Sequence, residues 1–344
     1  MTVPAPDQTH GLVCGHTHLY SALARGMPAP PKVPTTFTEI LEQVWWRLDR
    51  ALDLDLIAWS ARLGALEALE SGTTALVDHH SSPNAIEGSL DVIAAACAEV
   101  GVRVVCCYEV TDRNGLDGAK AGLAENERFL RSGARGYVGA HAAFTLSDET
   151  LESVVGLAAD LGAGVHVHVA EAAVDADAAA RWAPHADDRW LLAHGVHLAD
   201  ALPGTIAHNP RSNLNNAVGY GRPARFPRVV LGTDGIGADM VSEAQLAYVL
   251  HRSDDVTASP ETAWSWLANG EALVPDVADD VVTWSYAPMD AWHAAYTPGI
   301  HPTHIEVAGE VVLDELGPTR VDAAEIRAKA AEAAQRLFQR MGDV

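Results

Sequence analysis

Eight short runs rich in β-branched and apolar residues recur along the chain, and they constrain its fold more than any other feature. Helix-like or polar segments separate them. Residues 56–72 have apolar residues at helical spacing and close with Gly72, and Thr36 and Glu39 have the spacing of a capping box. This alternation predicts an α/β fold, a closed (β/α)8 barrel of the TIM type. The eight runs are GLVCGHTH, TTALVDHH, RVVCCYEV, RGYVGAHA, GVHVHVAE, WLLAHGV, GTIAHNP and RVVLGTDG.

Each run also ends in a residue that can titrate or bind a metal. In a parallel barrel the C-terminal ends of all strands meet at one mouth, where barrel enzymes assemble their chemistry. Core packing alone explains eight such ends poorly, because an unpaired imidazole or carboxylate among apolar neighbours costs desolvation energy. The eight residues are His18, His80, Glu109, His141, His168, His194, His208 and Asp234.

Two histidine-bearing runs supply the first candidate metal ligands. His16 and His18 are two residues apart on a strand, so they share a face and can bind one ion, although an isolated pair could equally be polar residues where a strand leaves its sheet. In VHVHVAE the valines would face the outer helices, and His166 and His168 would face inward. We expect His168 to be a ligand, and His166, one layer deeper, to be a hydrogen-bonded core residue. Glu171, just past this strand, could relay protons without binding the metal.

The last run places a carboxylate beside the first strand of a closed barrel. Asp234 could therefore bind the same ion as His16 and His18. Gly232 and Gly235 flank it and permit close backbone approach, although they also suit an ordinary tight turn. His194 ends the sixth run, where a neutral imidazole could orient water or substrate.

The ordered motifs GHTH, HVAE, LAHGVHL, AHNPRSNL and LGTDG resemble those of the amidohydrolase superfamily, in the branch of aminohydrolases and chlorohydrolases acting on triazines, guanine and related heterocycles. Within that branch, CGHTHLYSALARGMPAP, WWRLDRAL, CYEVTDRNG and GAHAAFTL are most similar to the SsnA-type aminohydrolases. The similarity runs from about Gly11 to Asp239.

The resemblance implies a mononuclear metal site and a reaction. We expect one divalent ion and take zinc as the first choice. Iron is the alternative, because histidine and carboxylate ligands suit both metals. The implied reaction is deamination of an aminated heterocycle or amidine-like small molecule, with release of ammonia. Hydrolysis of a cyclic amide or of a carbon–chlorine bond is an alternative, and so is a relative that binds a ligand without catalysis. The implied ligands are His16, His18, His168 and Asp234, and the implied catalytic residues are Glu171, His194 and Asp234.

Residues that would contact the small-molecule substrate are less clearly marked. Trp45 and Trp46 follow a proline-rich loop that can roof the mouth, and they could stack on a planar ligand or simply pack a helix onto the barrel. Asn213 could instead satisfy its own loop backbone. The candidates for substrate binding are Trp46, Tyr108, His141, Arg211 and Asn213.

The chain divides into three predicted parts. Residues 10–275 form the barrel, residues 276–318 a reduced C-terminal remnant of a small β-sandwich, and residues 319–344 a C-terminal helix. Relatives carry a longer segment before the first histidine pair, so the resemblance implies an N-terminal truncation. The remnant's unpaired edges need cover, either from a homodimer or from the short N-terminal segment.

The amino-acid composition argues against nucleic acid and membranes as binding partners of the protein. The 46 acidic and 23 basic residues give a net charge of -23, which would repel a phosphate backbone, so we expect no nucleic acid and a solvated acidic surface. No run approaches the length needed to span a bilayer, and no targeting segment is evident, which predicts a cytoplasmic protein without membrane contact. Four cysteines, without a C-x-x-C pair, make a disulfide framework unexpected.

Overall fold

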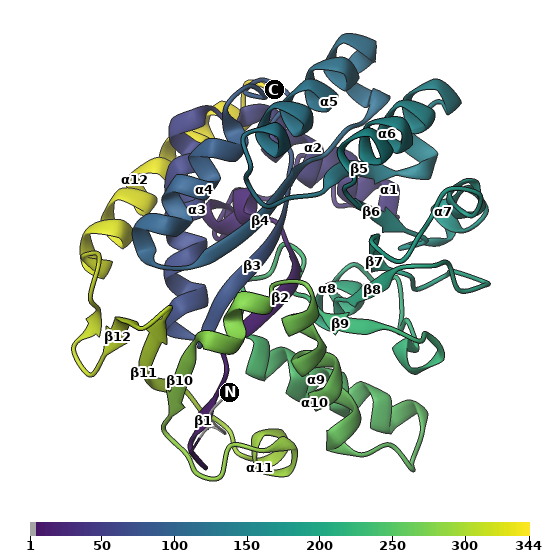
Figure 1. Cartoon of the computed structure of the whole chain (residues 1–344). Helices are drawn as coiled ribbons and strands as arrows, with labels where there is room; N and C mark the ends of the chain where they lie inside the picture. The colour runs from purple at the N-terminus through teal and green to yellow at the C-terminus, as the bar shows by residue number, and fades with distance from the viewer. Residues whose placement is uncertain (1–4) are drawn as a thin grey trace.

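The computed structural model, which describes residues 5–344, arranges the eight predicted runs as eight parallel strands of a barrel (Figure 1). Hydrogen bonds join β2-β3-β4 and β5-β6-β7-β8-β9. Parallel bridges from Thr17 to Asp234 and from Cys106 to Gly136 connect the two groups. The predicted barrel is confirmed. Its strands are β2 (Leu12–Thr17), β3 (Thr73–His80), β4 (Arg103–Tyr108), β5 (Val138–Ala142), β6 (Val165–Val169), β7 (Leu191–His194), β8 (Thr205–His208) and β9 (Val229–Leu231).

Helices surround this barrel, with one departure from the predicted alternation. In the described chain, residues 195–204 between β7 and β8 contain no helix. Gly195 begins this segment, and Pro203 and Gly204 end it, and these residue types favour turns over a helix. The helices are α1 (Phe37–Ile40), α2 (Trp46–Ala51), α3 (Leu54–Glu70), α4 (Ser89–Val100), α5 (Gly115–Arg131), α6 (Asp148–Leu161), α7 (Ala173–Ala176), α8 (Pro210–Asn215), α9 (Met240–Asp254), α10 (Pro260–Ala268), α11 (Ala291–Tyr296) and α12 (Ala323–Met341).

Small apolar side chains fill the barrel below its mouth. They come from six of the strands, and Val274 and Val277 pack against them from the segment after α10. A filled interior leaves room for polar chemistry only at the C-terminal ends of the strands. The strand residues of this inner core are Val13, Ala75, Val77, Val105, Leu191, Ala207 and Val230.

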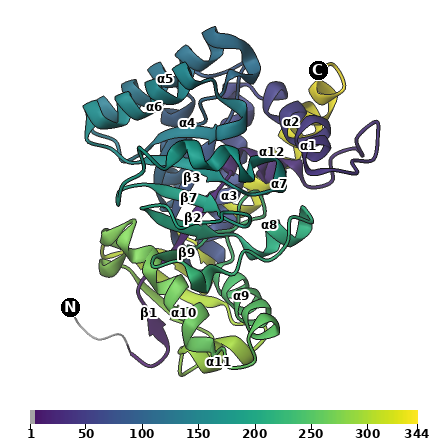
Figure 2. The same cartoon turned by 90° about the vertical axis from the view of Figure 1, so that its right-hand side faces the viewer.

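The C-terminal helix α12 covers the barrel beside α3 and α2 (Figure 2). Asp322 caps it by accepting hydrogen bonds from the backbone N–H groups of Ala324 and Glu325. The buried face repeats at helical spacing, which confirms the predicted amphipathic helix. Its buried residues are Ile326, Ala330, Ala333, Leu337 and Met341.

A small antiparallel sheet lies below the barrel, with strand order β1-β10-β11-β12-β13. The C-terminal part contributes β-strands, as expected for a remnant of a β-sandwich. Strand β1 pairs with β10, so the short N-terminal segment covers one edge of the sheet, which was one of the two expected ways of covering it. The domain boundaries at residues 275 and 318 stay a prediction. The strands are β1 (Gln8–Thr9), β10 (Val281–Trp284), β11 (Pro302–Val307), β12 (Glu310–Asp314) and β13 (Gly317–Pro318).

Buried Asp280 ties this sheet to the barrel. One carboxylate oxygen accepts a hydrogen bond from the Thr74 hydroxyl at 2.7 Å and pairs with Arg103, and the other accepts the backbone N–H of Ala308 at 3.1 Å. Thr74 lies on β3 and Arg103 on β4, whereas Ala308 lies in the turn between β11 and β12. The sheet is therefore attached by hydrogen bonds to a charged group, which are stronger than those between neutral partners.

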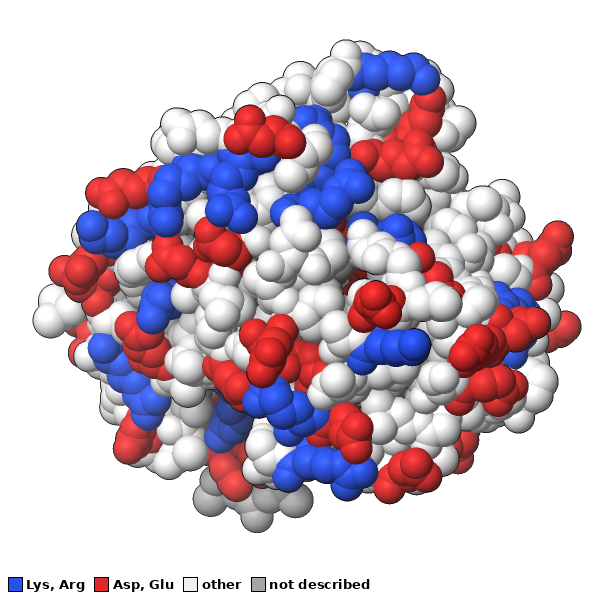
Figure 3. Space-filling model, turned by 90° about the horizontal axis from the view of Figure 1, so that it is seen from above, with Lys and Arg blue, Asp and Glu red and all other residues white. Residues whose placement is uncertain are grey.

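The surface carries both signs of charge. On the face drawn in Figure 3, acidic and basic side chains are interspersed. None of the helices within residues 5–344 is long and apolar enough to cross a membrane. All four cysteines are buried free thiols.

Replacing Leu337 by alanine tests the packing of α12. Leu337 is fully buried, so Leu337→Ala should lower the free energy of unfolding by about 2–5 kcal/mol through lost burial and a residual cavity. Leu316→Ala is the matched control, because Leu316 is 97% exposed and its truncation should change stability by less than about 0.5 kcal/mol. Urea denaturation measures both variants. Equal effects would contradict the packing described for α12.

Candidate metal centre and active site

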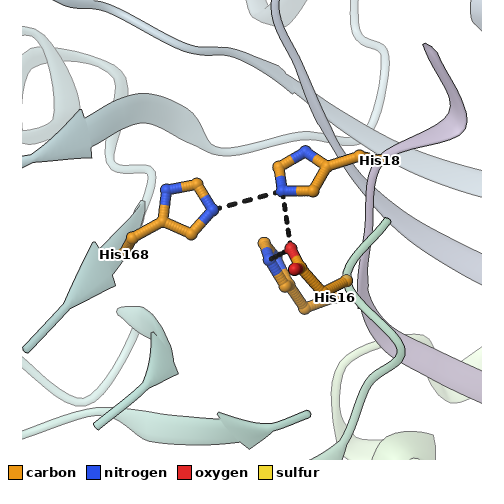
Figure 4. A group of neighbouring side chains, drawn as sticks. His16, His18 and His168 are labelled. Carbon is orange, nitrogen blue, oxygen red and sulfur yellow. Dashed lines mark hydrogen bonds and ion pairs between the residues drawn. The ribbon is translucent and has the colours of Figure 1, made fainter. Parts of the chain in front are cut away.

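Four side chains converge at the barrel mouth from three strands that are far apart in sequence. His16 lies on β2 and His18 directly follows it, His168 lies on β6, and Asp234 follows β9. Asp234 Oδ1 lies 3.2 Å from His16 Nε2 and 2.9 Å from His18 Nε2, and the Nε2 atoms of His18 and His168 are 3.2 Å apart. Figure 4 shows the three imidazoles turned toward one another.

These spacings suit a divalent ion. Nitrogen and oxygen atoms held about 2.0–2.1 Å from a tetrahedral metal ion lie about 3.3 Å from one another. The ligand atoms of the four side chains all lie within 4.8 Å of one another, and the four residues are buried. Imidazole nitrogens and a carboxylate oxygen directed at one point are ligands that zinc takes in proteins. The donor set therefore fits one divalent metal ion.

Second contacts point each imidazole toward this centre. His18 Nδ1 donates to the His79 carbonyl at 2.5 Å, and His168 Nδ1 donates to the His141 carbonyl at 2.9 Å. Carbonyl oxygens only accept, so the lone pairs are on the Nε2 atoms. His16 Nδ1 lies 2.9 Å from a nitrogen of His166, which has the hydrogen-bonded core position expected for it.

Asp234 is held by a close backbone approach between the last and first strands. The N–H groups of Thr233 and Asp234 both donate to the His16 carbonyl, at 2.9 and 3.0 Å. A Cβ atom on Gly232 would lie 2.8 Å from the backbone N and O of His16, so only glycine fits there. Asp234 has a φ of 56°, and its second carboxylate oxygen accepts the Ser212 hydroxyl. Strain of this kind persists where surrounding bonds fix the backbone.

A carboxyl group and an imidazole flank the metal ligands. Glu171 Oε1 accepts a hydrogen bond from the Asn216 amide at 3.2 Å, and Glu171 Oε2 lies 3.6 Å from His194 Nε2. Burial raises the pKa of Glu171 above its usual range, and the neighbouring His194 acts in the opposite direction. A separation of 3.6 Å is too long for a hydrogen bond, so Glu171 Oε2 and His194 Nε2 are both free to bond a molecule that lies beside them.

His194 has a defined orientation. It ends β7 with a φ of 74°, and its Nδ1 donates to Asn213 Oδ1 at 2.8 Å. Because the amide oxygen only accepts, His194 Nδ1 carries a proton, and its buried Nε2 faces Glu171 without a hydrogen-bond partner. Asn213 therefore contacts a predicted catalytic residue and not its own loop backbone.

The pocket above the metal centre has aromatic and acidic walls. Trp46 and His141, both predicted to contact substrate, line it, and their ring centroids are 6.2 Å apart. The Arg113 guanidinium lies 5.2 Å from the centre of the Trp46 ring. The lining also includes Tyr20, Phe37, Leu41, Trp45, Asp49, Glu109, Glu171 and Asn216.

Three residues predicted to bind substrate lie outside this lining. Tyr108 points from β4 toward α5, away from the pocket, because side chains alternate along a strand. A Cβ atom on Gly122 of α5 would lie 2.9 Å from the Tyr108 ring. Arg211 is held by Glu243, with Nε 3.0 Å from Oε2. Asn213 binds His194.

Sequence reasoning missed a buried charged group in the wall. Asp49 pairs with Arg113, and Arg113 lies 3.5 Å from Glu109. Glu109 was identified as a polar strand end but received no role, although alternation places it on the inward side, next to the outward Tyr108. Asp49 is three residues after Trp46 on α2, so helical spacing could have placed both on one face.

Comparison with known proteins agrees with this geometry. Residues 9–268 match the family model described as the amidohydrolase family. The chain is 30% identical to 5'-deoxyadenosine deaminase of Methanopyrus kandleri, over 95% of this chain and 86% of that protein. It is 31% identical to 5-methylthioadenosine/S-adenosylhomocysteine deaminase of Desulforudis audaxviator, over 71% of this chain and 61% of that protein.

Solved structures share the fold. An adenosine deaminase from Xanthomonas campestris with bound zinc has a TM-score of 0.78 at 22% identity, covering 96% of this chain and 86% of that one. An atrazine chlorohydrolase from Arthrobacter aurescens, complexed with zinc, has a TM-score of 0.79 at 21% identity, covering 95% of this chain and 88% of that one. The family model spans most of the chain, and the chain therefore belongs to the amidohydrolase family.

Proposed function

We propose that this protein is a metal-dependent aminohydrolase that replaces the amino group of an aminated heterocycle by oxygen and releases ammonia. The observation that carries the proposal is the convergence of four ligand atoms beside the pair formed by Glu171 and His194. The relatives described above are named as deaminases of adenosine derivatives, so we take adenosine derivatives as the first substrate class to test. Zinc is the proposed ion, and iron is the alternative.

The ligand set we propose is His16, His18, His168 and Asp234. A divalent ion bound there would act as a Lewis acid and lower the pKa of water toward neutrality. The chain itself supplies the fixed imidazoles, each with its Nδ1 already hydrogen-bonded, and the carboxylate held by Ser212. These contacts hold the four ligands in place before any substrate binds.

Proton transfer would fall to Glu171. Water adds to the carbon that bears the amino group, and Glu171 accepts a proton from that water. It delivers this proton to a ring nitrogen, then accepts the remaining proton from the newly added hydroxyl group and delivers it to the departing amine, so that the C–N bond breaks, ammonia leaves and a carbonyl remains. A raised pKa suits a carboxyl group that must both accept and donate near neutral pH. His194 Nε2 would accept a hydrogen bond from the attacking water or a substrate N–H group, and Trp46 and His141 would contact the ring.

Ammonia release from a panel of aminated heterocycles tests the proposal. The panel contains 5'-deoxyadenosine, 5'-methylthioadenosine, adenosine, guanine and melamine, each incubated with zinc-loaded protein. We expect ammonia from at least one of them, in amounts equal to the substrate consumed. Consumption of a substrate with release of chloride or ring opening, and no ammonia, would favour the alternative hydrolyses. No turnover of any aminated compound would contradict the proposal.

Replacing His168 separates metal binding from catalysis. His168→Ala should lose stoichiometric zinc, because one of the four ligand atoms disappears, and activity should be lost with the metal. His301→Ala, at an exposed histidine, is the matched control and should retain both. Plasma emission spectrometry of the dialysed proteins gives the zinc content. Full zinc occupancy in His168→Ala would contradict this ligand set.

Glu171→Gln keeps the shape of the side chain but removes proton transfer. Zinc content should be unchanged and kcat should fall by about 10²–10⁴-fold. Glu127→Gln, at an exposed ion pair, is the control and should match the unmodified protein. Steady-state ammonia release measures both. Unchanged turnover in Glu171→Gln would rule out this residue as the proton carrier.

Asn213 offers a test of the orientation of His194. Asn213→Ala removes the acceptor of His194 Nδ1–H, so kcat should fall by about 10–100-fold with zinc retained. Asn213→Asp keeps an acceptor oxygen and should restore most of the activity, which a merely structural role would not predict. Equal activity in the alanine and aspartate variants would contradict the assigned role.

A further inference from the structure

A second cavity lies next to the pocket above the metal centre. That pocket has a volume of about 40 Å³, whereas the adjoining cavity has a volume of about 620 Å³. His18, Trp45 and Asn216 line both, so the two spaces share one wall. A volume of 40 Å³ holds roughly three water molecules. The reacting end of a substrate fits there, and the larger cavity has the size of ordinary ligand sites.

The wall of the second cavity is mainly apolar. Its two hydroxyl groups are already bonded within the protein: the Thr17 hydroxyl donates to the Asp234 carbonyl at 3.1 Å, and the Ser21 hydroxyl donates to the His18 carbonyl at 2.8 Å. A ligand in this cavity would find apolar surface and few free hydrogen-bonding groups. The apolar residues that line it include Leu19, Ala22, Met27, Ile40, Val44 and Ile236.

The charged groups of the second cavity also neutralise each other. Arg25 and Glu67 line it and form an ion pair, with Arg25 64% and Glu67 26% exposed. Solvent reaches this pair, so it marks the outer rim. A charged substituent would have to compete with an existing partner, whereas an apolar substituent would not.

Trp45 forms the partition between the two spaces. It ends a π-helical turn, Leu41–Trp45, an irregularity that is frequent at functional sites. A Cβ atom on Gly235 would lie 2.9 Å from its ring, so the glycine lets the indole lie against the loop that follows Asp234. On the other side of the shared wall, Asn216 binds Glu171. A molecule spanning both spaces would therefore pass beside the proposed proton carrier.

We propose that the second cavity, hereafter the arm cavity, binds an apolar substituent of the substrate while the aminated ring reaches the metal centre. The inference rests on the proposed function for the identity of the reacting end. It adds the class of substrate, a heterocycle carrying an apolar arm. The shared wall with the catalytic pocket, the size of the arm cavity and its mainly apolar lining support this occupant over a polar or charged one.

Calorimetric binding to zinc-loaded protein tests the arm cavity. The probes are adenine and 9-hexyladenine, and melamine and N-hexylmelamine, so that two different rings each occur with and without the same arm. Each buried methylene group tightens binding about fourfold, and a partly buried hexyl chain should tighten it by about tenfold or more. A hexyl compound that binds no more tightly than its parent ring, for both rings, would overturn the proposal.

Filling the arm cavity should remove this advantage. Ala22→Phe places a large side chain on its wall, and the ratio of the two dissociation constants should fall to about one. Ile40→Trp fills the cavity from the facing segment and is the second variant if Ala22→Phe does not fold. Ala328→Phe, on the exposed face of α12, is the matched control and should keep the unmodified ratio. An unchanged ratio in a folded cavity variant would overturn the proposal.

The two proposals fail in different ways. Tighter binding of a hexyl compound without ammonia release from any heterocycle supports the arm cavity and contradicts deamination. Ammonia release with no advantage from the hexyl arm supports deamination and overturns the arm cavity.

Discussion

The closure of β9 against β2 is the contact on which the site depends. Two consecutive N–H groups, those of Thr233 and Asp234, donate to the carbonyl of His16. This brings a carboxylate from residue 234 beside two histidines near the start of the chain. Gly232 permits the approach, because any side chain there would collide with the backbone of His16. The closed barrel thus brings together ligands that sequence distance separates.

The polar contacts around the ligands organise the site further. The imidazoles of His18 and His168 donate to backbone carbonyls, and His194 donates to an asparagine on α8. Each contact occupies Nδ1 and directs Nε2 toward the mouth. The carboxyl group of Glu171 lies between Asn216 and His194, and its desolvation raises its pKa although both neighbours act in the opposite direction. The C-terminal ends of the barrel strands thus position both the proposed metal ligands and the proposed proton-transfer residues.

Much of the barrel could be predicted because its signals are local. Each strand run carries its own β-rich composition, and alternation in VHVHVAE correctly separates outward valines from inward histidines. The segment between β7 and β8 has no helix among the described residues and departs from a strict alternation of strands and helices, since glycine and proline at its ends favour turns. Tyr108 was misplaced because strand parity was not applied to it, and the same parity identifies Glu109 as the inward residue.

Other features depend on contacts that no local pattern reveals. Asn213 reaches His194 only after α8 turns back over the barrel, and Arg113 meets Asp49 across 64 residues of sequence. Whether the converged donors hold a metal is the central claim, and anomalous X-ray diffraction at the zinc edge of zinc-loaded crystals tests it most directly. We expect one strong peak about 2.0–2.1 Å from the Nε2 atoms of His16, His18 and His168 and from Asp234 Oδ1. A peak outside this cluster, or none in fully zinc-loaded protein, would contradict the account.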